Sequence, residues 1–188
     1  MFKPIYFKLN VLETTKETLF TSIFYFLAFF ITFEVFMPIQ SMAFPDYSSH
    51  ASLIFLPHGV RVIAAWLLGW RSVIALLPGV FLAYYYLAGA SVFELSRLIG
   101  MAVAVVVAPF LFYLAKALGW DVAPRSDRKP SWSSIMIIGG LAAVVSSTLT
   151  NLAFGSTATE YFAYLIGDIS GLFFLMLFLM FSFRALRK

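Results

Sequence analysis

The chain has no cysteine and only two histidines, and each shortage excludes a kind of chemistry. Without cysteine it can hold no disulfide, no thiolate nucleophile and no thiolate metal site. His50 and His58 give no paired spacing for a metal and no arrangement with serine that can be placed on adjacent helices. No Walker or Rossmann glycine pattern occurs. We therefore expect neither an enzyme nor a cofactor-binding protein.

Charged residues are also scarce. They make up 12% of the 188 residues, whereas 62% are hydrophobic. A soluble domain averages about a quarter charged residues, so this composition predicts an integral membrane protein with the lipid bilayer as its surroundings. The net charge of +4 comes from basic residues scattered at segment ends, without an aromatic-interleaved patch. We expect no nucleic-acid partner.

Long apolar runs predict an all-α bundle of about six transmembrane helices, forming one domain over residues 1–188. About 20 apolar residues are needed to cross roughly 30 Å of hydrocarbon. Two helices bury too little surface to form a separate domain, so all spans belong to one bundle. The expected spans are 18–37, 53–69, 72–89, 95–117, 133–153 and 162–183, with an inner loop at 118–132.

Lysine and arginine predict how these spans are oriented. If six spans alternate, every Lys and Arg of the loops and termini falls on one side, and only Arg61 and Arg97 lie inside or at the lip of a span. Cytoplasmic segments carry the excess of basic residues in membrane proteins. We therefore expect both termini to face the cytoplasm.

With this topology, most polar side chains inside the apolar segments lie toward the non-cytoplasmic third of the membrane. Ionisable groups in hydrocarbon are rare unless they are paired or hydrated, and they mark functional sites. We expect a ligand-binding pocket that opens away from the cytoplasm. Its candidate residues are Glu34, His58, Arg61, Arg97, Asn151 and Asp168.

The start of span two is difficult to explain as packing alone. Pro57 lacks an amide hydrogen and Gly59 lacks a Cβ, so the helix is expected to bend or to begin late. His58 and Arg61 are three residues apart and share one helical face. The competing interpretation is a simple helix start at the outer interface, with Arg61 extended outward to the headgroups.

Asp168 in span six is the natural counterpart. It lies about two turns into the span, and Gly167 and Gly171 beside it form a face that lets a neighbour approach closely. The carboxylate requires a cation, for which Arg61 is the first candidate and Arg97 the second. A structural ion pair and a ligand contact are equally compatible with the sequence.

Several short motifs recur in one known family. They are Pro57-x-Gly59, a short basic turn at Arg71, then Pro-Gly-x-Phe-Leu over 78–82, and Gly167-Asp168-x-x-Gly171. The chain thereby resembles the MASE1 family of bacterial membrane-embedded sensor domains. The resemblance implies a sensory module of the bacterial inner membrane, ordinarily fused at its C-terminus to a histidine kinase, diguanylate cyclase or similar output domain. This chain stops soon after Phe183, so we expect a separate protein partner for output.

The sequence leaves alternatives open for the ligand and for the class of function. Two arginines suit an anionic small molecule, because guanidinium binds carboxylate or phosphate bidentately. If Asp168 and Glu34 neutralise the arginines, the ligand is neutral or zwitterionic. The chain also resembles, in size, the substrate-binding subunits of energy-coupling-factor importers, although span one lacks their Ala-x-x-x-Ala docking face. A small-solute transporter and an accessory subunit of a larger membrane complex stay open as well.

Overall fold

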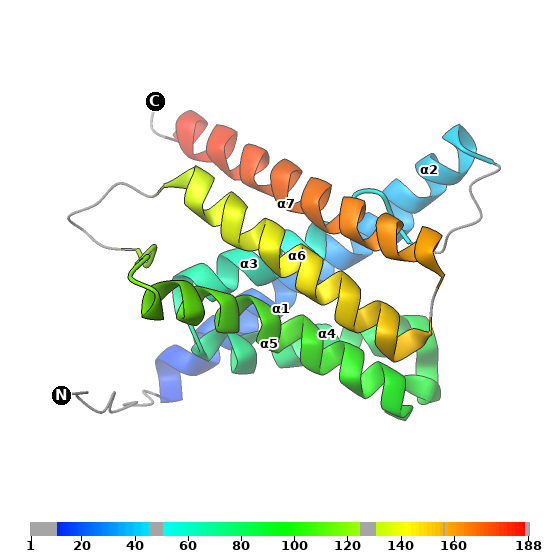
Figure 1. Cartoon of the computed structure of the whole chain (residues 1–188), viewed down its shortest axis with the longest axis horizontal. Coiled ribbons are helices and arrows are strands. Elements are labelled where there is room, and N and C mark those ends of the chain that lie inside the picture. The colour runs from blue at the N-terminus through cyan, green and yellow to red at the C-terminus, as the bar shows by residue number, and fades with distance from the viewer. Residues whose placement is uncertain (1–10, 46–50, 125–130, 156, 187–188) are drawn as a thin grey trace.

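The computed structural model is an all-helical bundle and describes residues 11–45, 51–124, 131–155 and 157–186 (Figure 1). The predicted all-α class is confirmed. The helices, in chain order, are α1 (Val11–Ile31), the π-helix η1 (Thr32–Phe36), α2 (Met37–Ala43), α3 (Leu56–Leu68), α4 (Arg71–Ala88), the 3₁₀-helix η2 (Gly89–Phe93), α5 (Leu95–Ala117), α6 (Trp132–Phe154) and α7 (Ala158–Leu186).

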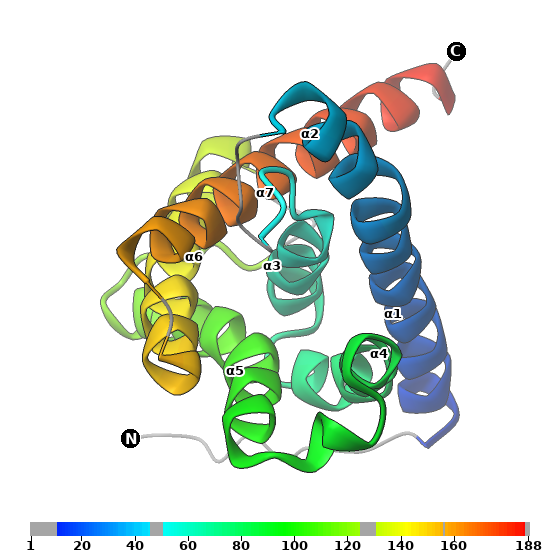
Figure 2. The ribbon, with the colours of Figure 1, turned by 90° about the vertical axis from the view of Figure 1, so that its right-hand side faces the viewer.

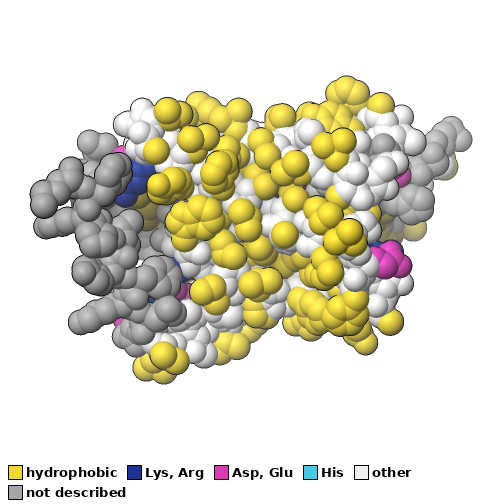
Figure 3. Space-filling view, turned by 60° about the horizontal axis from the view of Figure 1, so that its bottom comes forward, with side chains coloured by type: hydrophobic (Ala, Val, Ile, Leu, Met, Phe, Trp, Pro, Cys, Tyr) yellow, Lys and Arg dark blue, Asp and Glu magenta, His cyan; other side chains and the backbone are white. Residues whose placement is uncertain are grey.

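Five helical stretches are long and apolar enough to cross a membrane. They are Val11–Ala43, Arg71–Phe93, Leu95–Ala117, Trp132–Phe154 and Ala158–Leu186. Apolar side chains cover the middle of the face in Figure 3, and the charged side chains seen there lie near its two ends. Such a surface suits hydrocarbon in the middle and water at both ends. The chain is a multi-pass membrane protein.

The short helix α3 lies at the centre of the bundle. Figure 2, which looks along the bundle, shows α3 surrounded by the longer helices, and α3 packs against α1, α4, α5, α6 and α7. Its 13 residues rise only about 20 Å. Non-helical backbone at 51–55 precedes it, with Ala51 and Ser52 buried. The second predicted span is therefore a short helix entered through irregular backbone inside the protein.

The boundary prediction is close for four spans and wrong for the first. Helix α1 begins at Val11 instead of 18, and helix continues through η1 and α2 to Ala43, into the predicted outer loop. The polar first turns are held by an ion pair between Glu17 and Arg71 of α4, with Oε2 and Nη2 2.7 Å apart. Of the predicted inner loop at 118–132, residues 125–130 lie outside the described residues, as does His50.

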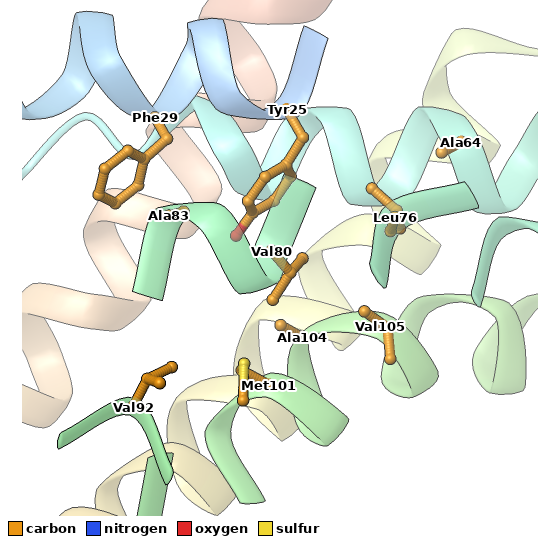
Figure 4. Packing of buried hydrophobic residues seen from close by; sticks show 10 residues of the cluster. All are labelled: Tyr25, Phe29, Ala64, Leu76, Val80, Ala83, Val92, Met101, Ala104 and Val105. Carbon is orange, nitrogen blue, oxygen red and sulfur yellow. The ribbon is translucent and has the colours of Figure 1, made fainter. Parts of the chain in front are cut away.

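The two ends of the bundle differ. Helix α1 begins and α7 ends at one end, here called the terminal end, while α2, η2 and the turn between α6 and α7 lie at the other, here called the distal end (Figure 1). The terminal half contains an apolar cluster of Val62, Ile135, Leu172 and Met176. A larger cluster between α1, α3, α4 and α5 extends toward the distal end (Figure 4).

Candidate ligand-binding site

The irregular backbone before α3 is held by side chains and backbone of η1, α2 and α7. Gln40 of α2 binds it twice, because its Nε2 donates to the Ala51 carbonyl at 3.1 Å and its Oε1 accepts from the Leu53 amide at 2.7 Å. The hydroxyl of Ser170 donates to the Leu53 carbonyl. Buried peptide groups without partners are costly, so these contacts permit non-helical backbone inside the bundle.

The first amides of α3 are satisfied in the same way. The Phe55 amide donates to the Gly167 carbonyl of α7 at 2.9 Å. The Leu56 amide donates to the hydroxyl of Thr32, which is fully buried in η1, at 3.3 Å. A helix start has amides without intrahelical partners, and here other helices supply the acceptors. We expected the helix around Pro57 to bend or to begin late, and the late start is confirmed, with α3 beginning at Leu56.

Two glycines of α7 make room for this segment. A Cβ at Gly167 would overlap the Ser52 carbonyl oxygen, and a Cβ at Gly171 would overlap that of Phe55. The predicted close approach at this glycine pair is confirmed, and the neighbour is irregular backbone instead of a regular helix.

Three of the predicted site residues meet in a buried cluster. Nη2 of Arg61 lies 3.4 Å from Oδ1 of Asp168, and Nδ1 of His58 lies 3.3 Å from Oδ2. Nε2 of His58 is 3.0 Å from the Gly139 carbonyl of α6; since that oxygen can only accept, Nε2 carries the hydrogen and donates. Arg61 is only 7% exposed. The prediction that Arg61 pairs with Asp168 is confirmed, and the competing interpretation of an outward-pointing Arg61 is wrong.

A cavity of about 290 Å³ adjoins this cluster. Every one of the longer helices contributes to its wall, mostly through its distal half. Among the described residues, only Arg61 and Asp168 bring a charge to it. Its wall consists of Tyr25, Phe29, Phe33, Ala51, Ser52, Phe55, Arg61, Ala83, Tyr84, Leu87, Ala104, Ser146, Ser147, Thr150, Phe154, Tyr164 and Asp168. The cavity is an aromatic and apolar chamber with one polar wall.

The polar wall contains side-chain atoms that lack hydrogen-bond partners. Among the residues that the structure describes, Nε of Arg61 and Oγ of Ser147 are buried without a hydrogen-bond partner. The Arg61 guanidinium also lies over the Phe55 ring, 5.5 Å from its centroid. Figure 4 shows Tyr25 extending from α1 into the interior, toward α4. Arg61 and Ser147 both line the cavity, so a molecule that reaches these two atoms would find polar groups without partners.

Of the six predicted residues, all of which the structure describes, only Arg61 and Asp168 line the cavity, and His58 contacts Asp168 without being part of the wall. The other three also lie outside the wall. Glu34 is exposed and accepts from the Tyr86 hydroxyl at 2.8 Å. Arg97 lies 3.8 Å from Glu94 at the start of α5, and Asn151 Nδ2 donates to the Thr157 carbonyl at 3.1 Å, across the turn between α6 and α7. The structure does not bring them to Arg61, and their contact with a ligand stays a prediction.

Sequence reasoning missed the rest of the polar wall. Tyr25 and Tyr84 are two of nine tyrosines and 22 phenylalanines, and nothing local distinguishes them from residues that face lipid. Ser147 belongs to a stripe with Gly139 and Ala143, all three buried, whose four-residue spacing indicates close helix packing. That spacing is consistent with a buried Ser147, but it does not predict the cavity beside this residue.

Comparison of the chain with models of protein families, with curated proteins and with solved structures gave no match. The resemblance to the MASE1 family stays a prediction. The class of the protein therefore follows from its own fold and site: a multi-pass membrane protein with a buried Arg61–Asp168–His58 cluster that opens onto a cavity.

Proposed function

We propose that the protein is a membrane-embedded module that binds a small molecule in this cavity and has a sensory role. The observation that carries the proposal is a polar wall whose Arg61 Nε and Ser147 Oγ lack partners among the described residues. Buried donors are satisfied in the great majority of proteins. An apolar pocket with a few convergent polar groups is the usual form of a ligand site.

The position of α3 supports a sensory role. Arg61 lines the cavity, and five residues further along the same helix the indole Nε1 of Trp66 donates to the Val122 carbonyl at 2.7 Å. Val122 belongs to the segment that follows α5 at the terminal end. A ligand that displaces Arg61 would thus act on a rigid helix tied to the opposite end of the bundle.

The proposed topology has six crossings, with both termini in the cytoplasm of a bacterial cell and the protein in its inner membrane. The described Lys16, Arg71, Lys116 and Arg184 lie at or near the ends of α1, α4, α5 and α7 that meet at the terminal end, as cytoplasmic ends require. The cavity would then lie in the non-cytoplasmic half. Output would pass through a separate protein partner that contacts the cytoplasmic end.

The test is a thermal-unfolding screen of the purified protein in nanodiscs against small solutes of diverse charge, with native mass spectrometry for co-purified molecules. A ligand that binds only the native state raises the unfolding midpoint. We expect at least one such solute, and loss of its effect in Ala104→Leu, which fills the cavity from α5. Ala102→Leu, on the exposed side of the same helix, is the matched control. No effective solute, or equal effects in both variants, contradicts the proposal.

Transport is the main alternative, because the cavity lies in one half of the bundle and solute-binding importer subunits also require a one-sided pocket. Cells that contain the protein should bind the identified solute without accumulating it if the module is a sensor. Uptake that depends on the protein would instead assign it to transport. A stoichiometric partner without any bound small molecule would favour an accessory subunit.

A further inference from the structure

The chemistry of the cavity wall selects among the ligands that the site can hold. We infer that the cavity binds a small monocarboxylate with an aromatic or short aliphatic body, whose carboxylate is held by Arg61 Nε and Ser147 Oγ. This inference rests on the proposed function, since it names the ligand class of the same site. It can fail while ligand binding itself stands.

The unsatisfied atoms set the polarity of the ligand. An arginine Nε can only donate, and a serine hydroxyl can donate or accept. Arg61 is 7% and Ser147 is 1% exposed, and both line the cavity. A ligand group that satisfies both must offer acceptor oxygens, and a charged acceptor forms the stronger bond to guanidinium.

The charges of the cluster are also compatible with an anionic ligand. Asp168 is shared, because one of its oxygens faces Arg61 and the other faces His58. The charge of Arg61 balances the charge of Asp168, so these two groups place no net negative charge on the wall that would oppose a monoanion.

The guanidinium of Arg61 also has one edge that makes no contact with Asp168. Its contact with Asp168 uses Nη2 alone, at 3.4 Å, instead of the two parallel bonds of a bidentate pair. Glu34, the other carboxylate predicted near this site, lies outside the cavity wall and accepts from Tyr86. Of the described part of the chain, Asp168 is thus the one acidic residue in the wall, and it leaves the Nε edge of Arg61 available.

The rest of the cavity wall limits the size of the ligand and favours an apolar body. The cavity's 290 Å³ corresponds to roughly ten water molecules at their liquid volume, which is small for a ligand pocket. Phe29, Phe33, Phe55 and Phe154 offer ring surfaces that stack or pack against an apolar body. One guanidinium anchor in a small aromatic chamber suits one carboxylate on a compact body, and we expect a long acyl chain to bind less tightly.

The experiment compares acids with their own amides. Benzoate, 3-phenylpropionate and hexanoate, each with the corresponding amide, are titrated by isothermal calorimetry into the protein in nanodiscs, together with inorganic phosphate and myristate. At least one short acid should bind about tenfold or more tightly than its amide, as expected when a charge-assisted bond is lost. Amides that bind as well as the acids, or tighter binding of phosphate or myristate, overturn the inference.

Variants locate the carboxylate. Arg61→Lys keeps the charge opposite Asp168 but removes Nε, and Ser147→Ala removes only the hydroxyl, so both should fold with a near-normal unfolding midpoint. The preference for acid over amide should fall about tenfold in Arg61→Lys and severalfold in Ser147→Ala. The control Lys116→Gln, which removes an exposed charge in the last turn of α5, should keep the preference. An unchanged preference in the first two variants overturns the inference. If neutral solutes bind and acids do not, only the ligand class fails; if the solute screen finds nothing, the proposed function fails too.

Discussion

The guanidinium of Arg61 in α3 and the carboxylate of Asp168 in α7 lie 3.4 Å apart inside the bundle, although 107 residues separate them in the chain. Both side chains are less than 10% exposed. Because water and lipid headgroups are out of reach, each charge depends on the other. This contact joins the central helix to the last helix and forms one wall of the cavity.

Removal of the carboxylate should destabilise the protein strongly. Asp168→Ala leaves Arg61 and His58 buried without their shared partner, and the loss of one member of a buried ion pair costs about 3 to 5 kcal/mol. Reversible unfolding in mixed detergent and SDS measures this free energy. The control is Glu94→Ala, which breaks the exposed contact with Arg97 and should cost less than about 1 kcal/mol. Equal losses in both variants would contradict a structural role for Asp168.

The glycines of α7 give a sharper test of the fold. In Gly171→Ala the added methyl group meets the Phe55 carbonyl, so the segment before α3 must move, and we expect a loss of about 1 to 3 kcal/mol. Gly140 in α6 has no other atom within 4 Å of a Cβ built on it. Gly140→Ala should therefore be neutral or stabilising by up to about 1 kcal/mol. The same unfolding assay compares the two, and the reverse order would disprove this packing.

Thr32 should be required for the start of α3. Thr32→Val keeps the shape of the side chain but leaves the Leu56 amide without its acceptor, at a cost of about 1 to 3 kcal/mol. Thr32→Ser keeps the hydroxyl and should recover much of this stability. In the control Thr148→Val, the lost hydroxyl bonds only its own helix, at the Val144 carbonyl. Unfolding free energies of the three variants decide whether the contact between η1 and α3 contributes to stability.

Trp66 should connect the cavity to the terminal end. A ligand found in the solute screen should change hydrogen exchange over residues 118–124 in the native protein, and Trp66→Phe should abolish this change while binding persists, because the bond to Val122 is gone. Trp70, 45% exposed and in contact with Tyr113, supplies the control Trp70→Phe. A ligand response that survives in Trp66→Phe would exclude this route.

The absence of cysteine allows a direct test of orientation. Ser41→Cys in α2 and Ala185→Cys in α7 place single thiols at exposed positions of opposite ends. In intact cells a membrane-impermeant maleimide should label position 41 and not 185, and both should react after the cells are opened. Labelling of 185 in intact cells would reverse the proposed topology.

The sequence by itself determined the elements that depend on local hydrophobicity. Helix α5 matches the predicted 95–117, because an apolar run between Glu94 and Lys116 has only one way to satisfy its backbone in lipid. The Arg61–Asp168 contact was also predictable, since a charge in an apolar segment has few partners to choose from. Hydropathy predicts which residues lie in the membrane, but it does not predict how far a helix continues beyond it. The start of α1 at Val11 was therefore missed.

Only the tertiary structure decided how deep α3 begins and where a cavity forms. The start of α3 depends on Thr32, Gln40 and Gly167, which are distant in sequence and whose contacts leave no periodic pattern. The cavity depends on how helix faces from the whole chain fit together, so no single segment encodes it. For the same reason the sequence could place Arg97, Glu34 and Asn151 near one end of their helices but could not say whether they line the cavity. Depth in the membrane follows from composition along the chain, whereas the meeting of side chains follows from packing in three dimensions.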